Sequence, residues 1–113
     1  MRSRSKTKVR LIGSAPVFAA LGDQTRLRIV SRLCEDGPMS ISRLTVGSRL
    51  TRQAVTKHLR VLEGAGLVRC ERLGRESVWR LERRRIERAR GYLEEISRQW
   101  GGALERLRRF VEE

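Results

Sequence analysis

Cationic and hydrogen-bonding side chains recur between Thr51 and Leu62, and no carboxylate interrupts them. A glutamine amide can pair bidentately with adenine, an arginine or lysine with guanine, and an alanine or threonine methyl group can meet the thymine methyl. These residue types suit the reading of base edges in a DNA major groove, whereas a merely solvated helix would mix charges of both signs. At helical spacing, the outward face of this segment presents Arg52, Gln53, Ala54, Thr56, Lys57 and Arg60.

Two kinds of DNA contact are expected, because phosphate contacts position a protein and base contacts specify the sequence. Arg72 and Arg75 flank Gly74 at the tip of a predicted hairpin, which could reach the minor groove or the flanking phosphates. The alternative is a structural hairpin with a basic tip. The residues assigned to base contacts are Arg52, Gln53, Thr56 and Lys57. The residues assigned to phosphate are Arg43, Arg60, Arg72 and Arg75.

Apolar spacing, helix caps and turn residues predict the elements that position these side chains. Asp23, Ser40 and Thr51 each precede a helical pattern and can cap it through a side-chain oxygen. The turn over Gly47–Leu50 is tight, so the helices on either side form a helix-turn-helix whose second helix enters the major groove. In chain order we expect helices over Ala15–Leu21, Gln24–Glu35, Ile41–Ser48 and Arg52–Gly64, a short strand at Met39–Ser40, hairpin strands over Leu67–Arg72 and Glu76–Leu81, and a helix over Glu82–Glu113.

This order predicts a mainly α fold with a β-hairpin, a winged helix-turn-helix with flanking dimerisation helices. Residues 15–81 form the DNA-binding domain and residues 82–113 the dimerisation helix. Residues 1–14 carry five cations among few apolar neighbours and are expected to form a disordered basic arm. Such an arm either follows the DNA backbone or is a solvated tail.

The last helix carries apolar residues in steps of three and four over more than three heptads, the pattern of a helix packed on another helix. Gly91, Gly101 and Gly102 each cost about 1 kcal/mol relative to alanine, which predicts a bend or an early end near Gly101. The residues of this seam are Ile86, Ala89, Leu93, Ile96, Trp100, Ala103, Leu107 and Phe110.

Two stretches of the chain resemble a known family of regulators. FAALGDQTRLRIV is similar to the entry of the arsenical-resistance-repressor (ArsR/SmtB) family, and LTRQAVTKHLRVLEGAGLV followed by LGRESVWRL is similar to its helix-to-hairpin region. The resemblance covers residues 16–81. It implies a homodimeric winged helix-turn-helix repressor whose first and last helices build the dimer interface, so Val17, Phe18 and Leu21 join the seam as interface residues.

The chain departs from the metal-sensing members of that family. Such members carry cysteines around the third helix or His and acidic ligands on the last helix, and this chain has neither Cys nor His in those two segments. His58 lies on the recognition helix, where a structural or phosphate-contacting role is expected. We therefore predict no metal and no cofactor, and the effector is open. Cys34 and Cys70 are expected on apolar faces as core residues, with a redox role left open.

A formal charge of +13 over 113 residues is typical of a nucleic-acid-binding protein. No run of about 18 apolar residues predicts a membrane span, and no enzyme signature is evident. We expect a cytoplasmic, nucleoid-associated regulator that binds double-stranded DNA as a homodimer and represses a palindromic operator, with regulation of its own gene left open. The alternative is a nonspecific architectural nucleic-acid-binding protein, and a regulator that mainly binds another protein is a second alternative.

Overall fold

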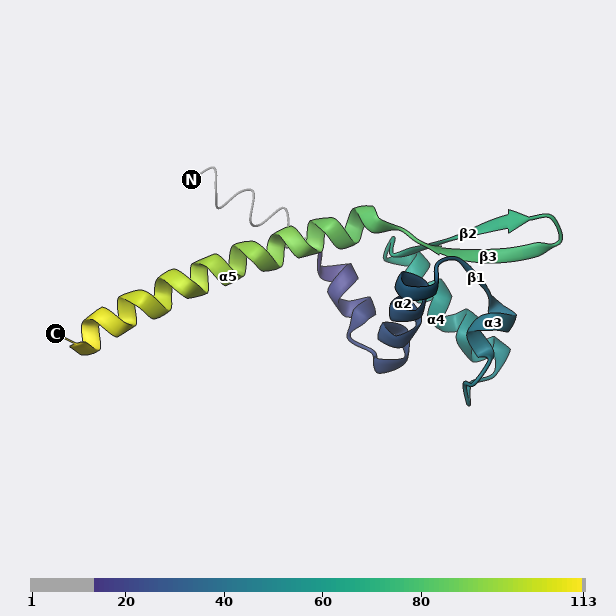
Figure 1. Ribbon diagram of the computed structural model, residues 1–113, viewed down its shortest axis with the longest axis horizontal. Helices are drawn as coiled ribbons and strands as arrows, with labels where there is room; N and C mark the ends of the chain where they lie inside the picture. The colour runs from purple at the N-terminus through teal and green to yellow at the C-terminus, as the bar shows by residue number, and fades with distance from the viewer. Residues whose placement is uncertain (1–13, 113) are drawn as a thin grey trace.

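Helices and a small sheet follow one another in the predicted order in the computed structural model, which describes residues 14–112 (Figure 1). Residues 14–21 are helical and lead into the labelled elements. The mainly α, winged helix-turn-helix class is confirmed. The expectation of a basic arm falls largely outside the described residues. The elements are α2 (Gln24–Asp36), β1 (Met39–Ser40), α3 (Ile41–Thr45), α4 (Arg52–Gly64), β2 (Val68–Leu73), β3 (Glu76–Leu81) and α5 (Arg83–Glu112).

The three predicted N-caps are confirmed. The side-chain oxygen of each capping residue accepts a hydrogen bond from the backbone N–H three positions later, at 2.9 Å for Asp23, 3.3 Å for Ser40 and 3.1 Å for Thr51. Each bond satisfies one of the amides that a helix leaves free at its N-terminus. The starts of α2, α3 and α4 are therefore fixed by local chemistry.

The sheet has the order β1-β3-β2, with both neighbouring pairs antiparallel. Leu73 pairs with Glu76, so the hairpin closes through the two residues Gly74 and Arg75. Only Gly74 of the two has a positive φ, at 65°, as a type II′ turn requires at its first position. The short β1 pairs Met39 with Trp79, which ties the segment before α3 to the hairpin.

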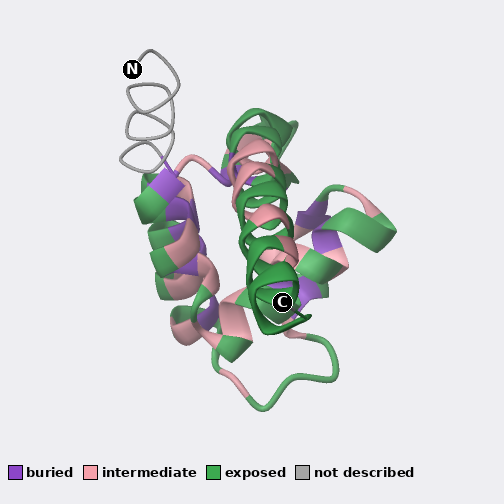
Figure 2. Cartoon of the chain, turned by 90° about the vertical axis from the view of Figure 1, so that its left-hand side faces the viewer, coloured by how far each residue is buried: buried purple, intermediate pink, exposed green. Residues whose placement is uncertain are grey.

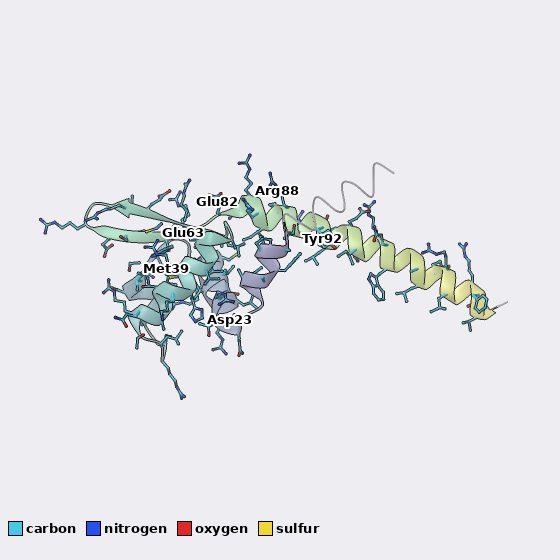
Figure 3. The ribbon with its side chains drawn as sticks, turned by 180° about the vertical axis from the view of Figure 1, so that it is seen from behind. Asp23, Met39, Glu63, Glu82, Arg88 and Tyr92 are labelled. Atoms are coloured by element: carbon cyan, nitrogen blue, oxygen red, sulfur yellow. The ribbon has the colours of Figure 1, made fainter. Side chains whose placement is uncertain are left out.

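The core lies where α4 meets α2 and the sheet. Helical spacing predicts that α4 buries Val55, Leu59 and Leu62. Each of the three is at most 1% exposed, so the prediction is confirmed. Met39 of β1, labelled in Figure 3, belongs to this core and is 1% exposed. The other buried apolar residues are Val17, Ala20, Ile29, Leu33, Met39, Leu44, Ala65, Leu67, Val68, Trp79 and Ala89.

Helical spacing predicts an apolar face of Leu27, Val30, Leu33 and Cys34 for α2, and this prediction is partly wrong. Leu27 is 49% exposed and Cys34 is exposed, whereas α2 buries Ile29 and Leu33 with Val30 beside them. Two overlapping stripes of apolar residues fit helical periodicity in this segment, and only packing against α4 and the sheet selects between them. Cys34 is therefore not a core residue, while Cys70 is half-buried against the core as expected.

Two helix ends also differ from expectation. α3 ends at Thr45 and not at Ser48, because the N–H of Val46 bonds to the carbonyl of Arg43 and closes the last turn. α5 passes through Gly101 without ending there. Gly102 follows that glycine directly, but good helix formers such as Gln99, Ala103 and Leu104 lie within one turn. Ion pairs such as Arg90–Glu94 add support four residues apart.

Most of α5 projects away from the rest of the chain (Figure 1), and the molecule is 66 Å long. Ala89 is buried, and the rings of Phe18 and Tyr92 lie 6.1 Å apart where α5 passes residues 14–21 (Figure 3). Beyond that point α5 is mostly exposed (Figure 2). Among the described residues, no helix is long and apolar enough to cross a membrane.

Candidate nucleic-acid interface

The outward face of α4 keeps the side chains that the sequence assigned to base contacts. Arg52, Gln53 and Lys57 are exposed, Thr56 is half-buried, and together they line a shallow hollow on this face. The face lies opposite the buried residues of α4, so it cannot rotate inward without exposing the core. Ala54 is half-buried at the edge.

The first turn of α4 adds backbone donors to this face. Amides at a helix N-terminus favour an anion, and no acidic residue lies in the first turn of α4. The hydroxyl of Thr56 donates to the carbonyl of Arg52 at 2.8 Å, which leaves its methyl group as the free contact surface. The start of α4 is thus suited to a phosphate, and its outer face to base edges.

One flank of α4 is fixed to the sheet by Arg60. Its guanidinium carbon lies 5.4 Å from the ring centroid of Trp79, and its Nη1 donates to Glu63 at 2.9 Å. A guanidinium over an indole face is attracted by the ring electrons. Arg60 is nevertheless 63% exposed, so the side chain assigned to phosphate also holds α4 on β3.

The other flank of α4 meets the N-terminus of α2. The Nδ1 atom of His58 lies 3.5 Å from Nη1 of Arg26 and 3.9 Å from the carboxylate of Asp23. The backbone N–H of Arg26 holds the pKa of Asp23 below its usual value, with a smaller contribution from the charge of Arg26. His58 therefore takes a structural place among the described residues.

The tip of the hairpin and α3 carry cations that face solvent. Arg72 and Arg75 beside the Gly74 turn are exposed, as is Arg43 on α3, and within residues 14–112 none of the three is ion-paired. A basic tip without a carboxylate partner fits the phosphate assignment.

A further basic surface was missed by sequence reasoning. α2 and the turn before α4 border a depression of about 600 Å³ lined by Arg28, Arg32 and Arg49 and by no acidic residue. Arg32 is held there, because it donates to the carbonyls of Leu44 and Arg43 at 3.0 and 3.2 Å. The available signal was that Arg28 and Arg32 lie off the apolar face of α2.

The residues assigned to a dimer interface fall into two groups. Val17 and Ala89 are already buried within one chain, and Phe18, Leu21 and Ile86 are partly covered by the core. Ile96 is half-buried and Ala103 exposed on α5. The large apolar side chains left uncovered on α5 are Leu93, Trp100, Leu104, Leu107, Phe110 and Val111, at 52–78% exposure.

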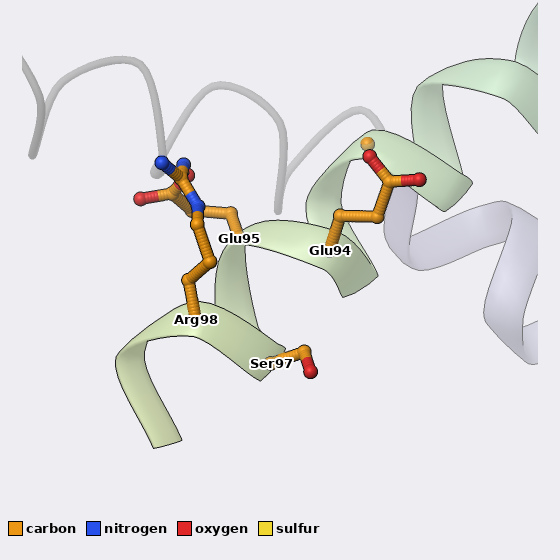
Figure 4. Close-up of a pocket in the computed structure, with 5 residues that line it drawn as sticks. Glu94, Glu95, Ser97 and Arg98 are labelled. Carbon is orange, nitrogen blue, oxygen red and sulfur yellow. The ribbon is translucent and has the colours of Figure 1, made fainter. Parts of the chain in front are cut away.

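Acidic side chains do not converge on a reactive centre in the hollow of α5 shown in Figure 4. Glu94 and Glu95 point in different directions, and Glu95 is paired with Arg98. Over residues 14–112 no three His, Cys, Asp or Glu side chains gather as metal ligands would. The absence of a metal site nevertheless remains a prediction.

Known proteins were compared with this chain by sequence and by structure. The helix-turn-helix domain family matches residues 21–71. The uncharacterized HTH-type transcriptional regulator YuzN of Bacillus subtilis is 43% identical over 68 residues, which are 55% of this chain and 74% of that protein. The similar regulator MJ1325 of Methanocaldococcus jannaschii is 33% identical over 61 residues, 54% of this chain and 68% of that one.

A solved structure extends the likeness to most of the chain. The ArsR-like transcriptional regulator from Rhodococcus sp. RHA1 superimposes with a TM-score of 0.75 at 33% identity, covering 88% of this chain and 92% of its own. The family of the relatives thus agrees with the resemblance carried by residues 16–81, and the similarity includes α5 as well as the helix-turn-helix.

Proposed function

Because the chain belongs to the ArsR-like family of helix-turn-helix transcriptional regulators, we propose that it is a homodimeric repressor of a palindromic DNA operator. Two copies of α4 enter successive major grooves, about 34–36 Å apart, as helix-turn-helix dimers do. Binding of this kind blocks transcription, including that of the regulator's own gene. The site of action is the chromosome in the cytoplasm, and no enzymatic step is part of the function.

The single observation that carries this proposal is the outer face of α4. Its exposed side chains are amide, hydroxyl and cationic groups, and it is held on both flanks by Arg60 and His58. A rigid helix with donors and acceptors that match base edges supports readout of sequence as well as binding to phosphate. A diffuse basic coat has no need of such a fixed face.

The dimer is supported by the uncovered apolar side chains of α5. Trp100 is 64% and Leu107 58% exposed in one chain, on a stripe that continues from the buried Ala89. Burial of apolar area by a second copy of α5 stabilises a complex at about 25 cal/mol per Å². The stripe therefore favours an interface built by α5, with residues 14–21 beside it.

The roles of single side chains follow from their positions. Gln53, with Arg52, Thr56 and Lys57, reads bases, while Arg75, with Arg43, Arg60 and Arg72, contacts phosphate. Loss of a phosphate contact weakens all sequences alike and lowers the salt slope by about 0.9, whereas loss of a base contact lowers only the preference for the operator.

The test is selection of bound duplexes from a random pool at about 150 mM salt, where purely electrostatic binding is weak. The expected product is a palindrome with half-sites one helical turn apart. Gln53→Ala is then expected to lose preference at one position of each half-site, and Arg75→Ala to lose affinity for every duplex. No enrichment, with tight binding only at low salt, would favour the architectural coat.

A further inference from the structure

We propose that Arg26 and His58 form a positioning pair that sets the orientation of α4 on the protein, so that operator recognition depends on two side chains that make no base contact. This role rests on the proposed function. It assigns to α2 a part in specificity, although α2 lies outside the helix-turn-helix itself.

Arg26 is fixed at two points before it reaches His58. Its Nε donates to the carbonyl of Ala20 at 2.7 Å, and its backbone N–H donates to the carboxylate of Asp23 at 2.9 Å. The third contact joins Nη1 to Nδ1 of His58 at 3.5 Å across 32 residues of sequence, and it is a long hydrogen bond in the neutral tautomer of His58 whose proton is on Nε2. Arg26 thus joins the end of the segment 14–21 and the start of α2 to the side of α4.

Arg26 and His58 supply a directional contact to α4, which the apolar face of this helix cannot. Contacts made by Val55, Leu59 and Leu62 are non-directional. They keep this face of α4 on the core, but they limit small rotations of the helix about its own axis only weakly. A hydrogen bond has a preferred distance and angle, and side chains that recognise a ligand must be held within about 0.5 Å and 10–20°. His58 directly follows Lys57, so its anchor sets the direction of the neighbouring side chains.

A direct phosphate contact explains Arg26 less well. Its side chain is partly buried and its Nε is occupied by the buried carbonyl of Ala20. His58 is likewise 24% exposed and faces α2. Arg88 on α5 is also exposed and lies outside the basic surfaces described above, which makes it a control for the loss of one positive charge.

The experiment measures the dissociation constants of full-length protein for the selected operator and for a random duplex over a range of salt. The variants are Arg26→Ala, His58→Leu, the double variant, His58→Asn and the control Arg88→Ala. His58→Asn keeps an acceptor near the position of Nδ1, whereas His58→Leu keeps only the volume.

The expected result is a loss of about tenfold on the operator for Arg26→Ala and for His58→Leu, as for a hydrogen bond to a charged group. The random duplex loses much less, the salt slope of His58→Leu is unchanged, and the double variant is no weaker than either single one. His58→Asn is expected to restore most of the affinity. Sedimentation and thermal unfolding check that each variant assembles and folds as the wild type does.

Several outcomes refute the positioning role of Arg26 and His58. Equal losses on both duplexes, with a slope lowered by about 0.9, make Arg26 a phosphate contact, and additive losses make the two residues independent. If Arg26→Ala fails to fold, equal operator affinity of His58→Leu and His58→Asn still refutes the role. A wild-type protein with no preference for any duplex refutes specific binding itself, and the role with it.

Discussion

The guanidinium carbon of Arg60 lies 5.4 Å from the ring centroid of Trp79, so an exposed residue of α4 covers a side chain of β3 that is only 1% exposed. Glu63 holds the same guanidinium at 2.9 Å from one helical turn further along. Helix α4 and the hairpin beside it are therefore joined by a contact that faces solvent.

The first prediction concerns the shape of that contact. Arg60→Lys keeps the charge but loses the planar guanidinium over the indole, so it is expected to lower the free energy of unfolding by about 0.5–1 kcal/mol. Urea denaturation followed by tryptophan fluorescence measures the loss. Glu63→Gln is the comparison, since it removes the ion pair and leaves the stacking; an Arg60→Lys variant as stable as the wild type would contradict a stacking contribution.

The second prediction concerns Trp79, whose indole Nε1 is buried without a hydrogen-bond partner among the described residues. Trp79→Ala is expected to cost about 3–5 kcal/mol of unfolding free energy, as large core truncations do. Trp79→Phe keeps an aromatic ring and removes the unpaired donor, whose burial costs about 1–3 kcal/mol. In a urea titration, Trp79→Phe should therefore lose clearly less unfolding free energy than Trp79→Ala. Equal losses for the two variants would argue that the N–H is paired.

The third prediction is a dependence of stability on pH at Asp23. The pKa of this carboxyl is lowered from 3.8 mainly by the hydrogen bond from the backbone N–H of Arg26. A depressed native pKa stabilises the fold above the unfolded value, and this contribution is lost as the pH falls through the lowered native value. Urea midpoints between about pH 6 and pH 2 should fall less steeply in Asp23→Asn, which keeps a capping oxygen.

If Asp23→Asn and the wild type lose stability in parallel over that range, the carboxylate is not the titrating group.

The fourth prediction concerns the hairpin turn. Gly74 has φ 65° and open space around its missing Cβ, so only backbone strain opposes a side chain there. Gly74→Ala is expected to cost about 1–3 kcal/mol, because the first position of a type II′ turn needs a positive φ in a region that only glycine adopts without strain. Thermal unfolding measures the loss; an alanine as stable as glycine would contradict the turn geometry.

The fifth prediction concerns assembly. Trp100→Glu or Leu107→Glu puts a charge on the uncovered apolar stripe of α5, and burial of an unpaired charge is costly. If the proposed dimer forms through α5, either change is expected to convert it to a monomer in sedimentation analysis and to weaken operator binding. The control is Arg109→Glu on the opposite side of α5; a dimer that survives both stripe variants would place the interface elsewhere.

Several features of this protein are determined by its sequence alone. The three N-caps, the turn at Gly74, the buried face of α4 and the order of the elements depend on residues a few positions apart. Capping bonds, turn conformations and the 3.6-residue period act over that range, which is why these predictions are confirmed. The polar outer face of α4 follows from the same period.

Tertiary structure alone decided which apolar stripe of α2 is buried, that Cys34 is exposed, and that α5 continues past Gly101. It also decided that Arg26 reaches His58 and that Arg60 lies over Trp79. Those partners are far apart in sequence, and their side chains meet only because α2, α4 and β3 pack around one core. Local preferences fix where an element begins and which residues share a face, whereas the choice between competing faces depends on the total apolar area that the whole fold can bury.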